Sequence, residues 1–115
     1  MSKISFEGIG EVVATFLCEE GVEAGQVVQV KESGKVGTCA GDDGFCGVAL
    51  SVEDGYAAVQ IGGLVKVAAS EDVTAGWCRL LANGTGGVKK DSATSPNGRD
   101  FLVVSKETDG AVVRL

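Results

Sequence analysis

The stretch GVALSVEDGYAAVQI, residues 47–61, decides the fold. Two apolar runs in it flank the pair Asp54-Gly55. Asp-Gly between apolar runs predicts a β-hairpin, because a type I′ turn needs positive φ at both central residues. FLVVSKETDGAVVRL, residues 101–115, has the same pattern and predicts a second hairpin that turns at Asp109-Gly110.

The similarity extends outward from the two hairpins. Val22-Glu23-Ala24-Gly25 is echoed 51 positions later by Val73-Thr74-Ala75-Gly76. Each motif precedes a strand-like run, a glycine-rich turn that leads to a valine, and a polar loop that ends at Phe45 or Phe101. We therefore expect a single β domain over residues 9–115, with pseudo-repeats at about 9–61 and 62–115.

The composition favours an all-β fold with many turns. Eighteen of the 115 residues are glycine and one is proline, which is typical of frequent turns. We expect about eight short strands in a compact β-barrel-like domain, because closure removes the exposed edges of Val-rich strands. Helix is limited to the acidic segments Glu19–Ala24 and Ser70–Ala75, and in the second of these Ser70, followed by Glu71 and Asp72, could cap one helical turn.

The charge argues against two classes of partner. Sixteen acids against ten bases give a net charge of −6, and no basic cluster exceeds Lys89-Lys90. Such a surface repels nucleic-acid backbones and anionic membranes, so we expect neither as a partner. Solubility is the simplest explanation of the acidity. The alternative is attraction to a basic partner surface.

The sequence has no apolar run long enough to span a bilayer and no basic start followed by an apolar core at its beginning. We expect a protein that is made and retained in the cytoplasm, unless it leaves as part of a larger particle. Its four cysteines should then be free thiols that act as small, mostly buried hydrophobes. Without histidine, a zinc site would need all four thiols at irregular spacing, so we expect no metal.

Catalytic machinery is not evident. The lack of histidine excludes Ser-His and Cys-His pairs. Cys39 and Cys46 flank an acidic turn, which raises a thiol pKa and argues against reactivity. Glu19-Glu20 and Glu53-Asp54 are adjacent acids of the kind that are usually just solvated. We expect no enzyme and no cofactor.

The aromatic residues are few and scattered along the chain. Stacking of bases or sugars needs several exposed rings together. We therefore expect most of these rings to anchor the core and one to contact a partner; they are Phe6, Phe16, Phe45, Tyr56, Trp77 and Phe101.

Residues 22–115 resemble a known family. The string Gly47-Val48-Ala49-Leu50, the pair Asp54-Gly55, the run 59–67, the motif 73–76 and the ending Val112-Val113-Arg114-Leu115 are similar to the head decoration (cement) proteins of tailed bacteriophages. Trp77-Cys78 and the long loop 89–99 depart from the family pattern. The resemblance implies a β-tulip or barrel-like domain, usually trimeric, that sits on the outside of the head and stabilises the capsid.

The same resemblance implies a flexible N-terminal arm, residues 1–8, and the major capsid protein as partner. We expect capsid or trimer contacts at Ile4, Phe6 and Trp77. The alternative for Phe6 is that it starts the first strand. Two other functions stay open: a β-rich ligand- or carbohydrate-binding module, which needs clustered aromatic rings on a concave face, and a small enzyme, which needs two acids converging in a pocket.

Overall fold

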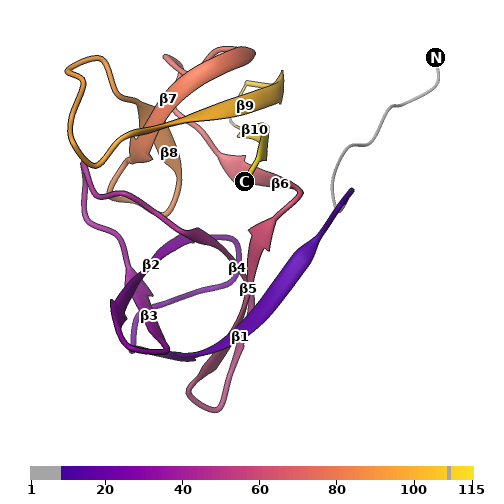
Figure 1. Ribbon diagram of the computed structural model, residues 1–115, viewed down its shortest axis with the longest axis vertical. Coiled ribbons are helices and arrows are strands. Elements are labelled where there is room, and N and C mark those ends of the chain that lie inside the picture. Colours follow the sequence, from indigo (N-terminus) through magenta and orange to yellow (C-terminus); the bar gives the residue numbers. More distant parts are fainter. Residues whose placement is uncertain (1–8, 109) are drawn as a thin grey trace.

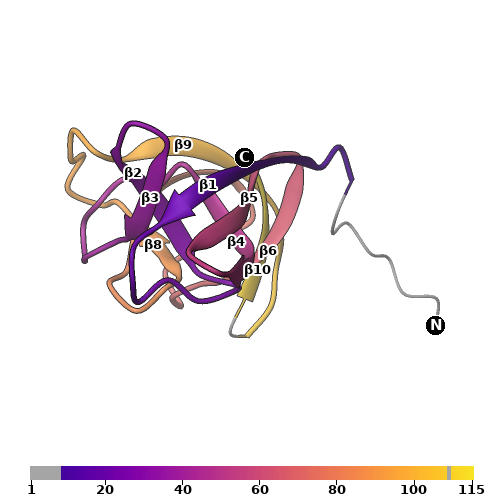
Figure 2. The same ribbon diagram turned by 90° about the horizontal axis from the view of Figure 1, so that it is seen from below.

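The computed structural model describes residues 9–108 and 110–115, and within them it contains strands and turns but no helix. Two five-stranded units lie one above the other (Figure 1; seen from below in Figure 2). The all-β prediction is confirmed, with ten strands rather than about eight. They are β1 (Val12–Cys18), β2 (Val27–Glu32), β3 (Lys35–Thr38), β4 (Gly47–Glu53), β5 (Tyr56–Gly62), β6 (Leu64–Ala68), β7 (Gly76–Ala82), β8 (Val88–Lys90), β9 (Arg99–Lys106) and β10 (Gly110–Arg114).

The first unit is a closed barrel with the strand order β1-β3-β2-β4-β5. β5 pairs antiparallel with β1, and β1 closes the ring by parallel pairing with β3 at Leu17 and Cys18. We call this unit the first barrel.

The second unit, β6-β10-β9-β7-β8, repeats the pairing order of the first. β6 pairs with β10 as β1 pairs with β5, and β7 lies between β8 and β9 as β2 lies between β3 and β4. One parallel bridge, Ala69 to Val88, stands where β1 and β3 pair. We call this unit the second sheet. The prediction of two similar halves is confirmed, and both carry the barrel-like pairing.

The repeated Val-x-Ala-Gly motif now has a physical explanation. Val22 and Val73 are both buried, each in the core of its own half. Gly25 and Gly76 have φ values of 90° and 99°, which side chains disfavour. The motif thus combines a core anchor with a left-handed turn into the next strand.

Both predicted hairpins are present as antiparallel pairs, β4 with β5 and β9 with β10. Asp54 and Gly55 have φ values of 53° and 80°, so the predicted type I′ turn is confirmed. In the second hairpin Lys106 pairs with Ala111, and Asp109 of the turn predicted at Asp109-Gly110 lies outside the described residues. Gly110 starts β10 and pairs with Ala68 of β6.

The core has two parts. A small cluster fills the first barrel and consists of valine and alanine: Val22, Val28, Val36, Ala49, Ala57 and Val59. A larger cluster fills the second sheet and also takes in residues of the first barrel: Val27, Cys39, Val48, Val65, Val67, Val73, Cys78, Leu80, Ala82, Val88, Val103, Ala111 and Val113. Because the larger cluster includes residues from both halves, the two units share one continuous apolar interface.

No helix in the described part of the chain has the length and apolar character needed to cross a membrane. The segments expected to form helical turns are hydrogen-bonded turns, such as the one closed by the N–H of Val73 donating to Ser70 at 3.1 Å.

Candidate interaction surfaces

The junction between the halves brings the two ends of the described chain together. The N–H of Leu64 donates to the carbonyl of Ile9 at 2.9 Å, and the N–H of Leu115 donates to Gly63 at 2.9 Å. Gly63 has a φ of 82°, and a Cβ there would overlap the carbonyl oxygen of Gly10. Only glycine fits this position, so the sequence Gly62-Gly63 permits the chain to pass from one half to the other.

Gln60 fixes the same junction from inside. Its side chain is buried, and its Nε2 donates to the carbonyls of Gly62 at 2.9 Å and Leu64 at 3.1 Å. An unpaired buried amide would be costly, so these bonds hold the backbone on both sides of Gly63 in place.

Two loops join the halves on another side. The loop between β3 and β4 exchanges backbone hydrogen bonds with the end of β7, from Asp42 to Ala82 at 3.0 Å and from Ala82 to Asp43 at 2.8 Å. Asn97, in the loop between β8 and β9, donates its Nδ2 to the carbonyl of Asp42 at 3.3 Å. Phe45 and Phe101, matched in the sequence repeat, stack with ring centroids 4.9 Å apart.

A hollow of about 360 Å³ lies over these loops. It is lined by both halves: Gln29, Val30, Gly44, Phe45, Cys46, Leu80, Pro96, Asn97, Arg99 and Phe101. The two phenylalanines lie nearly parallel, at an interplanar angle of 12°, so each covers a face of the other. A sugar-binding platform needs open ring faces, so the hollow is a poor fit to the carbohydrate-binding alternative.

The loop between β8 and β9 is held by a buried ion pair. Arg79 Nε lies 2.9 Å from Asp91 Oδ2, and the Asp91 side chain is 1% exposed. The N–H of Ser95 also donates to Asp91, at 2.8 Å. Burial raises the pKa of the Asp91 carboxyl, but the hydrogen bonds from Ser95 and Arg79 outweigh it and hold the pKa below its usual value. A Cβ at Gly98 would overlap Asp91 Oδ2, so this loop closes tightly on the pair.

Acids from different segments do converge in one hollow of about 300 Å³, which Asp42, Asp72 and Asp91 line. Each has a partner: Asp42 pairs with Lys89, Asp72 accepts from the N–H of Lys90, and Asp91 binds Arg79. Carboxylates occupied in this way are structural, and a general acid would need a raised pKa, the opposite of that at Asp91.

The thiols differ in exposure. All four cysteines are free; Cys39 and Cys78 are buried, Cys18 is half-buried and Cys46 is exposed. The expectation of mostly buried thiols is therefore wrong for Cys46, which directly precedes β4. Burial, with the negative charge of Asp43, raises the pKa of Cys39 to about 12, which keeps it protonated.

Among the described residues no group of three or more cysteine, aspartate or glutamate side chains is arranged to hold a metal ion.

Of the three predicted contact residues, Trp77 lies within the described part of the chain. It is 66% exposed on β7, with the Arg114 guanidinium 5.5 Å from its ring centroid. Ile4 and Phe6 lie outside the described residues, as does the predicted arm 1–8. Tyr56, also exposed, is on the first barrel, so the exposed rings of the described residues are divided between the halves.

Sequence reasoning missed an apolar face on the first barrel. Val13, Leu17 and Tyr56 are 43%, 48% and 53% exposed. Leu17 pairs directly with Tyr56, and Val13 lies four residues before Leu17 on the same face of β1. The signal was the run Val12–Cys18, VVATFLC, which is apolar on both of its alternating faces although a strand with one solvated face should alternate with polar residues.

No protein-family model and no curated protein matches this chain. Solved structures of phage proteins are similar to it, among them the following two. The head fiber gp8.5 N base of bacteriophage phi29 has a TM-score of 0.62 and 17% identity, over 91% of this chain and 93% of that one. A chain from the capsid of Myoviridae phage XM1 has a TM-score of 0.64 and 14% identity, over 99% of this chain and 92% of that one. The chain thus has a fold that is found in a phage head fiber base and in a phage capsid.

Proposed function

We propose that this chain is a non-enzymatic structural protein of a bacteriophage head, and that it decorates and stabilises the outside of the capsid. The observation that carries the proposal is the shared fold over more than nine-tenths of each compared chain, with proteins of a phage head fiber and a phage capsid. The sequence resemblance to head decoration proteins points the same way. Fold alone does not determine function, so the proposal rests on both.

The proposed partner is the major capsid protein, and the proposed assembly is a homotrimer that forms on the head. A small β domain buries only about two-thirds of its unfolded surface, so it gains stability from neighbours.

We propose that Trp77 contacts a neighbouring copy, because a large exposed ring next to Arg114 is of the type enriched at protein interfaces. Residues 1–8, with Ile4 and Phe6, are proposed as an arm that binds the capsid. The protein would be made in the host cytoplasm and end on the virion exterior.

Co-sedimentation with expanded heads of the phage that encodes this chain tests the proposal. The full-length protein should pellet with the heads at micromolar concentration and stay in the supernatant without them. A chain lacking residues 1–8 should bind at least tenfold more weakly if the arm contributes. Failure of the full-length protein to bind would refute the decoration role, whereas unchanged binding of the truncated chain would refute only the arm.

A further inference from the structure

Exposed apolar side chains are concentrated on the first barrel. Among the described residues, ten large hydrophobic side chains are exposed, and eight of them belong to residues 12–61. The other two are Ile9 and Trp77. Single exposed hydrophobics are ordinary, but a contiguous group marks an interaction site.

Three of the eight form one surface, which we call the docking stripe: Val13, Leu17 and Tyr56. Leu17 and Tyr56 are direct cross-strand neighbours on β1 and β5, and Thr15 pairs with Ala58 on the same face between Leu17 and Val13. β1 also has an open edge, because its pairing with β3 is confined to Leu17 and Cys18. No described strand of this chain covers the stripe or the edge beside it.

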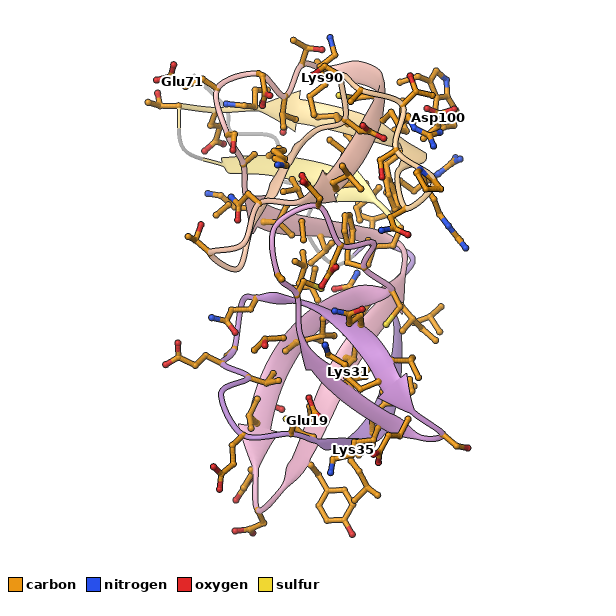
Figure 3. All side chains as sticks on the ribbon, turned by 90° about the vertical axis from the view of Figure 1, so that its left-hand side faces the viewer. Glu19, Lys31, Lys35, Glu71, Lys90 and Asp100 are labelled. Atoms are coloured by element: carbon orange, nitrogen blue, oxygen red, sulfur yellow. The ribbon has the colours of Figure 1, made fainter. Side chains whose placement is uncertain are left out.

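The same half carries the acidity. Residues 12–62 hold eight acids and two bases, whereas residues 64–114 hold six acids and seven bases. Both bases of the barrel, Lys31 and Lys35, come from β2 and the start of β3 (Figure 3). β1, β4 and β5 contain one charged residue, Glu53, which pairs with Tyr56 at the end of the stripe.

We propose that the docking stripe binds an apolar protein surface that carries excess positive charge. This rests on the proposed function, under which that surface is the outer face of the head shell. Apolar contact supplies the desolvated centre of such an interface, and charge complementarity steers and orients the approach. A second copy of this chain is disfavoured as the occupant, because two barrels facing each other would bring their negative charges together.

The orientation of the protein follows. The first barrel faces the shell and the second sheet faces away from it. Trp77, on the second sheet, is then left for contacts between copies.

Head co-sedimentation with variants tests this inference. Leu17→Ser combined with Tyr56→Ala should weaken binding to heads at least tenfold. Val30→Ser is the matched control, since Val30 is 52% exposed on the same barrel but lies on β2, away from the stripe, and it should bind within twofold of wild type. Circular dichroism should show that all three proteins are folded. Wild-type affinity should also fall as salt is raised from about 50 to 300 mM, since Debye screening weakens attraction between exposed charges.

The outcomes separate the two proposals. If wild type binds heads and the double variant binds equally well, the docking stripe is wrong while the decoration role stands. Loss of binding in Trp77→Ala with retention in the double variant would place the contact on the second sheet and also overturn the inference. A double variant that loses self-association but still binds heads would make a second copy the occupant. If wild type does not bind heads, the decoration role fails and the inference fails with it.

Discussion

The first barrel and the second sheet pair their five strands in the same order, but they fill their interiors differently. The buried cluster of the barrel contains no side chain larger than valine. The cluster of the second sheet contains Leu80 and extends into the barrel, and partly buried phenylalanines pack against both clusters, Phe16 in the barrel and Phe45 and Phe101 in the second sheet. Pairing order therefore does not determine packing, and the second sheet supplies most of the shared core.

The surfaces of the two units also differ, and here it is the barrel that has more exposed apolar side chains. The barrel exposes the docking stripe and carries most of the negative charge, whereas the second sheet has nearly balanced charges and one large exposed hydrophobic, Trp77. If the proposed docking stripe is correct, the first barrel is the binding half and the second sheet is the supporting half.

The largest expected loss of stability is for a substitution at the junction between the two halves. Gly63→Ala places a methyl group against the carbonyl oxygen of Gly10 in a left-handed backbone. Strain and overpacking together should lower the free energy of unfolding by about 3 kcal/mol or more. Urea unfolding followed by circular dichroism measures it.

Gly55→Ala is the matched control. Gly55 has a similar φ of 80°, but nothing lies within 4 Å of the position that a Cβ would occupy there. The change should cost only about 1–2 kcal/mol of left-handed strain. Equal losses in the two variants would show that close packing at the junction does not couple the halves.

Core truncations in the two halves should differ in size. Leu80→Ala in the second sheet should cost about 3 kcal/mol, and Val59→Ala in the barrel about 2 kcal/mol, since both side chains are fully buried and leucine leaves the larger cavity. Because the halves share a core, each variant should shift one cooperative transition. Two separate transitions, of which each variant moves one, would contradict a common core.

The buried ion pair should give the second sheet a pH dependence. The folded-state pKa of Asp91 lies below its unfolded value of about 3.9. Ionised Asp91 therefore stabilises the fold above that value, and its contribution is lost as pH falls through the folded-state pKa. In Asp91→Asn the urea midpoint should be lower at pH 7, and its further decline below pH 5 should be shallower than in wild type.

Asp43→Asn is the corresponding change in the first barrel. Hydrogen bonds from the backbone N–H of Ala40 and from the side chain of Gln29 lower the pKa of Asp43. Ionised Asp43 should therefore stabilise the fold, as ionised Asp91 does, and its contribution should also be lost at low pH. Asp43 is more exposed than Asp91, and we expect a smaller effect. An Asp91→Asn protein with the full wild-type pH dependence would show that the ion pair with Arg79 does not contribute.

The smallest effect on stability is expected at Trp77. The side chain is 66% exposed, the Arg114 guanidinium lies 5.5 Å from its ring centroid, and Leu102 is its cross-strand neighbour. Trp77→Ala should cost no more than about 1 kcal/mol, the size of an exposed cation–π interaction. A larger loss in thermal unfolding would mean that Trp77 supports the second sheet rather than a contact between copies.

Local signals in the sequence predicted the fold better than they predicted the surfaces of the molecule. Asp54-Gly55 predicted its turn because the two residues alone determine the backbone there. Asp109-Gly110 predicted a hairpin between the strands that became β9 and β10, which do pair, but Asp109 itself lies outside the described residues. The exposure of Cys46 depends on how the loop before β4 packs on the second sheet.

The docking stripe shows a different limit. Val13, Leu17 and Tyr56 are residue types that a buried strand would also contain, so their exposure depends on which neighbours cover them. The charge difference between the halves was already present in the sequence. The charge difference can be related to binding only when the structure shows that the barrel and the second sheet form separate faces of the molecule.

Cryo-electron microscopy of heads decorated with this protein tests the central claim most directly. The account predicts density at the shell in which residues 12–62 face the capsid, with Leu17 and Tyr56 at the contact and the second sheet directed outward. Density with the second sheet and Trp77 against the shell, and the first barrel outward, would contradict it.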